Sequence, residues 1–285
     1  MLLRFRYILF AVFAALFLIG CQSLDVDRCL NVDSASAAPF EITTLEFGQA
    51  VLFDDSLLSL AAKGNKQRAM QTEALFHQHC PSLRVDEIPK SVQHNYVCTV
   101  MGEVDEKIVI GSHYDKVRRG LGIADNWSGV VLNVHLLAYF AESKPYYTLE
   151  FVAFGEEEPG MFGSKQYLLA HNQSPTIAMI NIDTLGLGPI VVDKRSDESL
   201  NCLATNIAGE LGIDVEFSNW DDITGDWEPF KQQGIPVLNL SSINRKTIHR
   251  IHNQRDREGN VDPRLMHEAL QIFIAVIENI NQVKK

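Results

Sequence analysis

Short apolar runs rich in β-branched residues alternate along this chain with longer segments of helical pattern, and no other feature restricts its fold as strongly. Strands that alternate with helices of about ten to fifteen residues predict a mostly parallel sheet with helices on both faces. The expected strands are 96–101, 107–110, 148–154, 177–182 and 236–240. The expected helices are 57–79, 128–141, 164–171, 198–211, 226–233 and 263–283. The predicted fold class is therefore α/β, with a mostly parallel, mixed central sheet.

Residue types that bind metal ions stand at or just after the ends of most of these strands. The candidates lie in five motifs, one ligand from each: His113 with Asp115, Asp125, Glu157 with Glu158, Asp183, and His252. In an open α/β sheet, ligands bind at the carboxyl ends of the strands. Two imidazoles and three carboxylates meeting there suit a pair of Zn²⁺-like ions. Two ions that share a carboxylate can activate a water and polarise a carbonyl, so this pattern predicts a metal-dependent peptidase.

Each motif taken alone also permits a structural interpretation. Asp125 could cap the helix that begins near Ser128, because Asp is a favoured N-cap residue. The three acids 156–158 are typical of a solvated turn, and Asp183 could belong to a turn. The functional interpretation therefore depends on the whole set of motifs.

In this order, the motifs resemble those of metallopeptidase family twenty-eight over roughly residues 95 to 265. This family includes aminopeptidases, glutamate carboxypeptidase and glutaminyl cyclase. The resemblance implies a di-zinc exopeptidase-like fold. It implies that His113 and Asp183 bind one ion and that Glu158 and His252 bind the other. Asp125 would bridge the two ions.

The resemblance also implies the catalytic groups. Glu157 would be the general base that takes a proton from a metal-bound water. Asp115 would orient the imidazole of His113. The assignment within the three acids depends on register, and a slip of one residue would make Glu156 the base and Glu157 the ligand.

The histidine of the last motif has a rival in His249. His252 is preferred because Asp256 and then Asn260-Val261-Asp262 follow it with the spacing of the family. The segment 225–236 resembles a family segment that lines the substrate pocket, with Trp227 in the place of a common His. Trp227 and Phe230 are therefore the pocket candidates.

The first residues have the pattern of an export signal. Arg4 and Arg6 precede the apolar run 7–19, and Leu-Ile-Gly-Cys then resembles the lipobox of bacterial lipoproteins. This resemblance implies cleavage before Cys21, acylation of Cys21 and attachment to a membrane. Gln22 after the cysteine favours the outer membrane, with the protein facing the periplasm. A plain cleaved signal peptide and an uncleaved N-terminal helix remain alternatives.

The expected organisation is a signal peptide at 1–20, a tether at 21–45 and a single catalytic domain at 46–285. Without Arg4 and Arg6, 23 of the 25 Lys and Arg residues remain against 36 Asp and Glu residues, a net charge of −13. This balance disfavours nucleic acid and anionic lipid as partners. In an oxidising compartment Cys80 and Cys98 could form a disulfide, although isolated buried thiols are the alternative.

Together these features predict a zinc-dependent aminopeptidase of the cell envelope that binds two ions and acts on peptides with a free N-terminus. The first alternative is a glutaminyl cyclase, which would use one zinc ion to cyclise N-terminal Gln. The second is a non-catalytic envelope lipoprotein.

Overall fold

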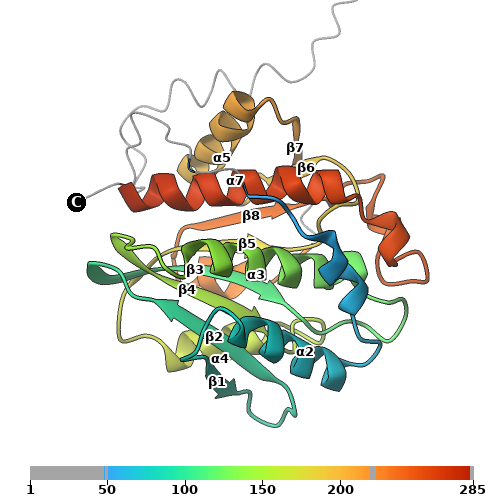
Figure 1. Cartoon of the computed structure of the whole chain (residues 1–285), viewed down its shortest axis with the longest axis horizontal. Coiled ribbons are helices and arrows are strands. Elements are labelled where there is room, and N and C mark those ends of the chain that lie inside the picture. Colours follow the sequence, from blue (N-terminus) through green and yellow to red (C-terminus); the bar gives the residue numbers. More distant parts are fainter. Residues whose placement is uncertain (1–47, 49–50, 219–222, 283–285) are drawn as a thin grey trace, which may run out of the picture.

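The computed structural model describes residue 48 and residues 51–218 and 223–282. The predicted signal peptide, the tether and Cys21 lie outside the described residues. Within them, eight strands form one sheet in the order β1-β2-β4-β3-β5-β8-β6-β7 (Figure 1). The strands are β1 (Arg84–Glu87), β2 (His94–Val100), β3 (Val104–His113), β4 (Tyr147–Phe154), β5 (Thr176–Ile182), β6 (Ile190–Asp193), β7 (Val215–Ser218) and β8 (Val237–Ser241). The predicted α/β fold class with a mixed sheet is confirmed.

The centre of the sheet is parallel. Strands β4, β3, β5 and β8 pair in parallel, whereas β2 is antiparallel to β4 and β6 is antiparallel to β8. Every residue of β4 is buried, as expected for a strand covered by helices on both faces. Successive residues of β3 enter different cores: Ile108 and Ile110 belong to one apolar cluster and Val109 to the other.

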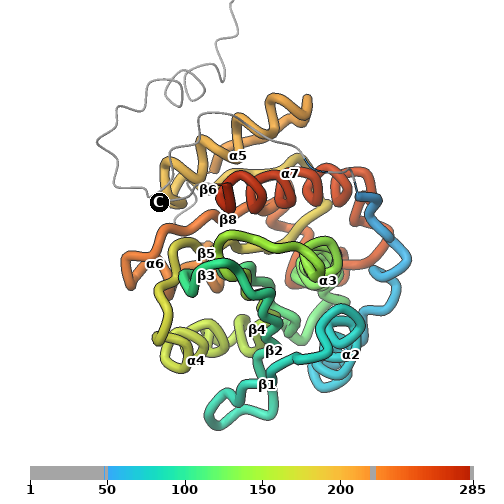
Figure 2. The backbone as a smooth tube through the Cα atoms, turned by 60° about the vertical axis from the view of Figure 1, so that its left-hand side comes forward, coloured from blue at the N-terminus to red at the C-terminus, as the bar shows by residue number. Residues whose placement is uncertain are grey.

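Helices cover both faces of this sheet. Figure 2 shows α4 and α6 on one side of the strands and α2 and α3 on the other. The α-helices are α2 (Asn65–His77), α3 (Ser128–Phe140), α4 (Phe162–Ala170), α5 (Glu198–Leu211), α6 (Trp227–Gln232) and α7 (Pro263–Gln282). The shorter turns are η1 (Asp55–Leu60), η2 (Ile123–Trp127), η3 (Ile248–Arg250) and η4 (Glu258–Asn260). None of the helices in the described ranges has the length and apolar character needed to span a membrane.

The structure corrects the predicted elements in two ways. The helix expected over 57–79 is divided into η1 and α2, because Gly64 takes an extended conformation before α2 begins. Strands β1, β6 and β7 were not predicted. Each of them has only four residues, so the apolar pattern in the sequence is too short to identify them.

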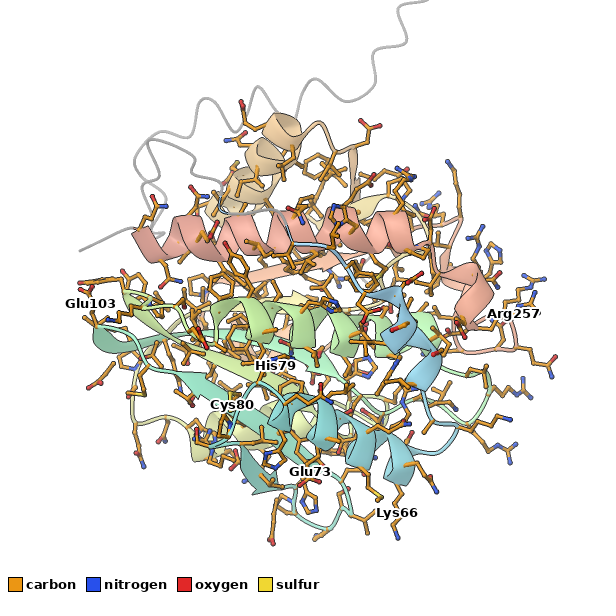
Figure 3. The ribbon with its side chains drawn as sticks, viewed as in Figure 1. Lys66, Glu73, His79, Cys80, Glu103 and Arg257 are labelled. Atoms are coloured by element: carbon orange, nitrogen blue, oxygen red, sulfur yellow. A yellow bond between two sulfur atoms is a disulfide. The ribbon has the colours of Figure 1, made fainter. Side chains whose placement is uncertain are left out.

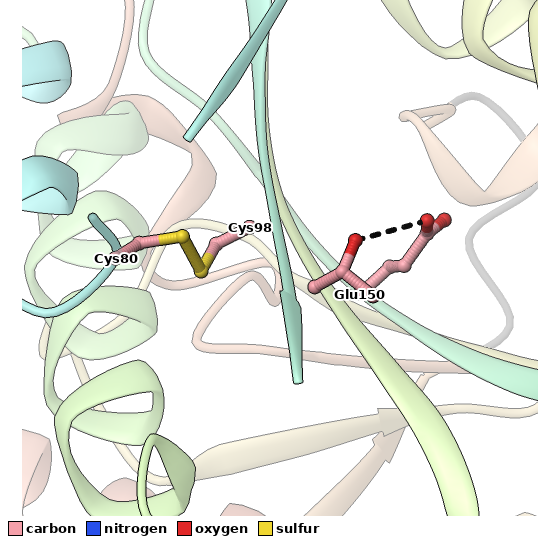
Figure 4. The surroundings of a disulfide bond; sticks show 4 residues. Cys80, Cys98 and Glu150 are labelled. Atoms are coloured by element: carbon pink, nitrogen blue, oxygen red, sulfur yellow. Dashed lines mark hydrogen bonds between the residues drawn. A yellow bond between two sulfur atoms is a disulfide. The ribbon is translucent and has the colours of Figure 1, made fainter. Parts of the chain in front are cut away.

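One disulfide joins the helical layer to the sheet. Cys80 follows α2, Cys98 lies within β2, and their Sγ atoms are 2.01 Å apart (Figure 4). This is the pair considered from the sequence.

Candidate metal centre

The parallel strands bring the candidate ligands to one edge of the sheet. His113 is the last residue of β3 and is paired with Phe154, the last residue of β4. The acids 156–158 begin two positions after the end of β4, and Asp183 follows β5. Figure 3 shows this direction: Glu103, just before β3, lies at the end of the molecule opposite Arg257. Residues that are far apart in the sequence thus meet at the carboxyl ends of the strands, where the strand pattern predicts a site.

The first group of donor atoms consists of His113, Asp125 and Asp183. Nε2 of His113 lies 3.3 Å from Oδ1 of Asp125 and 3.6 Å from Oδ1 of Asp183. The hydroxyl of Thr184 donates a hydrogen bond of 2.9 Å to the same oxygen of Asp183. The imidazole of His113 therefore faces two carboxylates in a buried setting.

The second group consists of Asp125, Glu158 and His252. Nε2 of His252 lies 2.8 Å from Oδ2 of Asp125 and 3.2 Å from Oε2 of Glu158. Asp125 belongs to both groups and offers a different oxygen to each histidine. The two groups together contain the five residues that the sequence assigned to the two ions, with Asp125 counted in both.

The spacing of the donors fits zinc. In a tetrahedral zinc site with bonds of about 2.0–2.1 Å, neighbouring ligand atoms lie about 3.3 Å apart. The distances between the histidine nitrogens and the carboxylate oxygens, 2.8 to 3.6 Å, are close to this value. Imidazole and carboxylate are also a usual zinc donor set. The shared carboxylate of Asp125 makes the arrangement suited to two neighbouring ions.

Asp115 holds the first histidine and the acids together. Its backbone oxygen lies 3.1 Å from Nδ1 of His113, and its Oδ1 lies 3.6 Å from the same nitrogen. Its carboxylate also accepts hydrogen bonds from the backbone nitrogens of Glu157 and Glu158, at 3.1 and 3.3 Å. Asp115 thus contacts the imidazole of His113 and also fixes the turn that carries the acids.

Asp256 supports the backbone of the site in the way that Asp115 does, and the sequence analysis did not assign this role to it. Its buried carboxylate accepts hydrogen bonds from the backbone nitrogens of Ala124 (2.7 Å) and Asp125 (3.3 Å). It therefore fixes the backbone that carries the shared ligand. The only signal in the sequence was its position four residues after His252.

The side chain of Asn126, and not that of Asp125, caps the start of helix α3. Oδ1 of Asn126 accepts hydrogen bonds from the backbone nitrogens of Gly129 (2.9 Å) and Thr184 (3.1 Å). This cap joins the start of α3 to the end of β5. The carboxylate of Asp125 is consequently available to the two histidines.

The three consecutive acids point in different directions. Glu156 has a positive φ of 56°, and its carboxylate accepts a hydrogen bond from the hydroxyl of Ser91, away from the donor groups. Oε1 of Glu158 accepts a hydrogen bond of 3.0 Å from the backbone nitrogen of Val117. Oε2 of Glu157 lies 3.7 Å from Nε2 of His113, yet Glu157 belongs to neither donor group. This geometry is the one expected for a base at Glu157 and a ligand at Glu158.

Several pKa values in this cluster are raised, because many carboxylates lie close together in it. Hydrogen bonds to Asp125 and Glu158 raise the pKa of His252 to about 10. Burial raises the pKa of Glu157 well above its usual range, and the charges of Asp226 and Asp183 add to this effect. Burial also raises the pKa of Asp226 to about 7. So many carboxylates close together are stabilised by protons or by metal cations.

A cavity of about 370 Å³ opens beside the donor groups. Its apolar wall comprises Ile223, Ile243, Ile248, Ile251 and Trp227, and Asn239 and Ser241 add polar groups. None of the isoleucines was predicted, because they come from two irregular segments without a recognisable pattern.

The assignment of Phe230 to this pocket is wrong. Phe230 is fully buried and packs against Phe154 and Tyr167, on the face of the sheet that α4 and α6 cover. Trp227 and Phe230 lie three positions apart in α6, but only Trp227 lines the cavity.

Comparison with known sequences gives a consistent match. The model of "Peptidase family M28" matches residues 95–277. Leupeptin-inactivating enzyme 1 of Streptomyces exfoliatus is 35% identical over 149 residues, which are 50% of this chain and 34% of that protein. The chain thus spans about a third of the length of this relative.

Solved structures share the fold at lower identity. LapB of Legionella pneumophila has a TM-score of 0.73 at 16% identity, over 85% of this chain and 79% of that one. BSAP, a zinc aminopeptidase from Bacillus subtilis, has a TM-score of 0.59 at 19% identity, over 65% and 49%. A glutaminyl cyclase from an Acidobacteriales bacterium has a TM-score of 0.66 at 18% identity, over 84% and 99%.

Proposed function

Because the chain belongs to peptidase family M28, we propose that it is a zinc-dependent aminopeptidase that releases N-terminal residues from peptides. The observation that carries this proposal is the pair of donor groups that share Asp125, with Glu157 beside them but in neither group. Two ion positions next to a free carboxylate are the parts that metal-assisted hydrolysis requires.

Each group of the chain then has a distinct task. His113 and Asp183 would hold one zinc ion, Glu158 and His252 the other, and Asp125 both. Zinc bound there would polarise the scissile carbonyl and lower the pKa of a bound water. Glu157 would accept a proton at a carboxylate oxygen and return it to the leaving amine.

The cavity supports action at the peptide N-terminus. The carboxylates that line it would be neutralised by the proposed ions, and one ion would bind the free α-amine of the peptide N-terminus. The isoleucines and Trp227 of the cavity offer an apolar wall to the first side chain. We expect apolar N-terminal residues to be released fastest.

A mass-spectrometric assay tests the proposal directly. The protein would be incubated with Zn²⁺ and a mixture of peptides, one of which begins with Gln, and a chelator would be added to a parallel sample. Chelator-sensitive loss of whole N-terminal residues is expected. Peptides that stay intact in both samples would contradict the proposal.

The same assay separates the second candidate, a glutaminyl cyclase. This candidate is supported by the fold likeness to a cyclase over most of both chains. It predicts loss of ammonia from the Gln peptide alone and one bound zinc ion. The shared position of Asp125 between two donor groups favours the two-ion aminopeptidase.

The cellular location is a separate part of the proposal. The lipobox-like Leu-Ile-Gly-Cys supports acylation of Cys21 and attachment to the outer membrane, with the enzyme facing the periplasm. Cells supplied with a labelled fatty acid should incorporate it into the full-length chain but not into the Cys21→Ala variant. Equal labelling of the two would exclude a lipid anchor at this cysteine.

A further inference from the structure

Exposed cations gather in two loops beside the cavity, although the chain as a whole is acidic. We call them the basic rim: Arg118, Arg119, Arg245, Lys246, Arg255 and Arg257, all exposed. These six are drawn from only 25 Lys and Arg residues in a chain with a net charge of −11. Such a local reversal of sign marks a surface that attracts anions.

The two loops that carry the rim lie against each other. The backbone nitrogen of Leu121 donates a hydrogen bond of 3.0 Å to the backbone oxygen of Asp256. A Cβ atom added to Gly120 would stand only 2.3 Å from the backbone oxygen of Asn253. These contacts bring the loop of Arg118 and Arg119 against the part of the second loop that holds Arg255 and Arg257, although the two loops are more than a hundred positions apart in the sequence.

Both loops also form part of the site. The first contributes the backbone nitrogen of Val117 to Glu158, and the second carries His252. Ile243, Ile248 and Ile251 line the cavity between or beside members of the basic rim. The rim thus borders the cavity on the side of Glu158 and His252.

Among the residues that the structure describes, the cations of the rim have no ion-pair partner. No ion pair within residues 51–218 and 223–282 involves a side chain of the basic rim. Between Arg245 and Glu258 the acids are Asp256, which is buried and bonded to the backbone, and exposed Glu258. The surface has acids inside the cavity and unpaired cations around it.

We propose that the basic rim selects peptides that carry a carboxylate within the first few residues after the scissile bond. This inference rests on the proposed aminopeptidase activity. The N-terminus of such a peptide enters the cavity, and its carboxylate stays at the rim. Guanidinium groups suit this role because they can donate two parallel hydrogen bonds to one carboxylate. The carboxylate can be an acidic side chain or the C-terminus of a short peptide.

Matched peptides distinguish these two sources. Leu-Glu-Gly amide is compared with Leu-Lys-Gly amide, and Leu-Gly-Gly with its amide, by measuring kcat/KM for leucine release. Each wild-type ratio should exceed one, by about three- to tenfold at low salt for a few exposed charges. Each should approach one in 1 M salt, where the screening length is about 3 Å.

Two variants test the rim itself. In the double variant Arg118→Gln/Arg119→Gln, the ratios should fall toward one. Arg264→Gln is the matched control, because Arg264 is an exposed arginine of α7 outside the basic rim, and its ratios should equal those of wild type.

Several results would overturn the inference. Wild-type ratios of one, or ratios unchanged in the double variant, would show that the rim does not select substrates. Ratios of one together with salt-sensitive binding to anionic phospholipid vesicles, lost in the double variant, would assign the rim to a membrane surface instead. If no peptide released leucine, the aminopeptidase proposal would fail, and this inference with it.

Discussion

At the scale of single residues, Glu157 is the side chain whose role is most specific. It lies beside His113 but belongs to neither donor group, so its removal should affect proton transfer more than metal binding. We expect Glu157→Gln to keep zinc while kcat falls by about 10²- to 10⁴-fold, the usual contribution of a general base. Zinc content and peptide turnover, measured on the same sample, check this. Full turnover in this variant would remove Glu157 from the mechanism.

Asp125 differs from the other ligands because both donor groups depend on it. Asp125→Asn should weaken the binding of both zinc ions, whereas Asp183→Asn should weaken only the one held with His113. The affinity lost at each affected site should be about 100-fold or more, since even indirect supports of a metal site are worth about 10- to 100-fold. Zinc per protein, determined after dialysis against a weak chelator, distinguishes the two variants. Loss of a single ion from Asp125→Asn would contradict a shared ligand.

The protonation of His252 gives zinc binding a defined pH dependence. Hydrogen bonds to Asp125 and Glu158 raise its pKa to about 10, so the imidazole is protonated at pH 7 without metal. Zinc needs the neutral imidazole. Binding should therefore release protons at pH 7, and zinc affinity should rise as the pH approaches 10.

The stability of the metal-free protein should have the opposite trend. A folded-state pKa above the usual value of 6.5 contributes stability that is complete below pH 6.5 and lost as pH rises through 10.

The protons that zinc binding releases are measured by calorimetric titration with zinc in two buffers of different ionisation heat. His249→Ala should release as many as wild type. Binding heats that are equal in both buffers would mean that no proton leaves.

At the scale of elements, helix α2 supports the metal centre from outside the segment that the family model matches. Arg68 is fully buried, and its guanidinium donates hydrogen bonds to the backbone oxygens of Tyr114, Leu121 and Gly122. Asn65 adds hydrogen bonds to both backbone groups of Lys116. Helix α2 therefore ties both ends of the loop that separates His113 from Asp125.

Arg68→Lys tests this support, since lysine keeps the charge but cannot reach three carbonyl oxygens from one planar group. We expect zinc affinity to fall by about 10- to 100-fold, as for other indirect supports of metal ligands. Lys107→Met is the matched control: Lys107 is also a buried, hydrogen-bonded cation, but it stands in the first half of β3, far from His113. Both variants should melt at lower temperature, and only Arg68→Lys should bind zinc more weakly. Equal zinc affinity in the two would limit Arg68 to stability.

At the scale of the whole molecule, the proposed ions join segments from five parts of the fold. The ligands come from β3, η2, the turn after β4, the end of β5 and the loop before α7. Each zinc ion, at 100 times its dissociation constant, should add about 2.7 kcal/mol to the free energy of unfolding. Thermal denaturation should therefore show a melting temperature about 5–10 °C higher for each bound ion than with a chelator. Asp125→Asn should show little of this shift, and a wild-type melting temperature indifferent to zinc would argue against a structural contribution of the ions.

Much of the fold could be predicted from the sequence alone, and so could the grouping of the candidate ligands. The alternation of strands and helices identified the sheet, because the apolar period of each element is a local property. Among the candidate ligands, His113 ends β3, and Asp183 and Glu158 follow β5 and β4, so their place at the carboxyl ends of the strands follows from the strand pattern in the chain. The strands β1, β6 and β7 were not predicted, because four residues are too few to show an apolar pattern.

Only the tertiary structure decided the rest. It decided that the carboxylate of Glu156 bonds to Ser91, and that Phe230 packs in the core while Trp227 lines the cavity. It also decided that Arg68 bonds to the loop between His113 and Asp125. It also brought the two loops of the basic rim together. Each of these facts is a contact between segments distant in the sequence. Such contacts depend on packing and backbone direction, whereas the identity of the ligands depends on local motifs that the sequence carries directly.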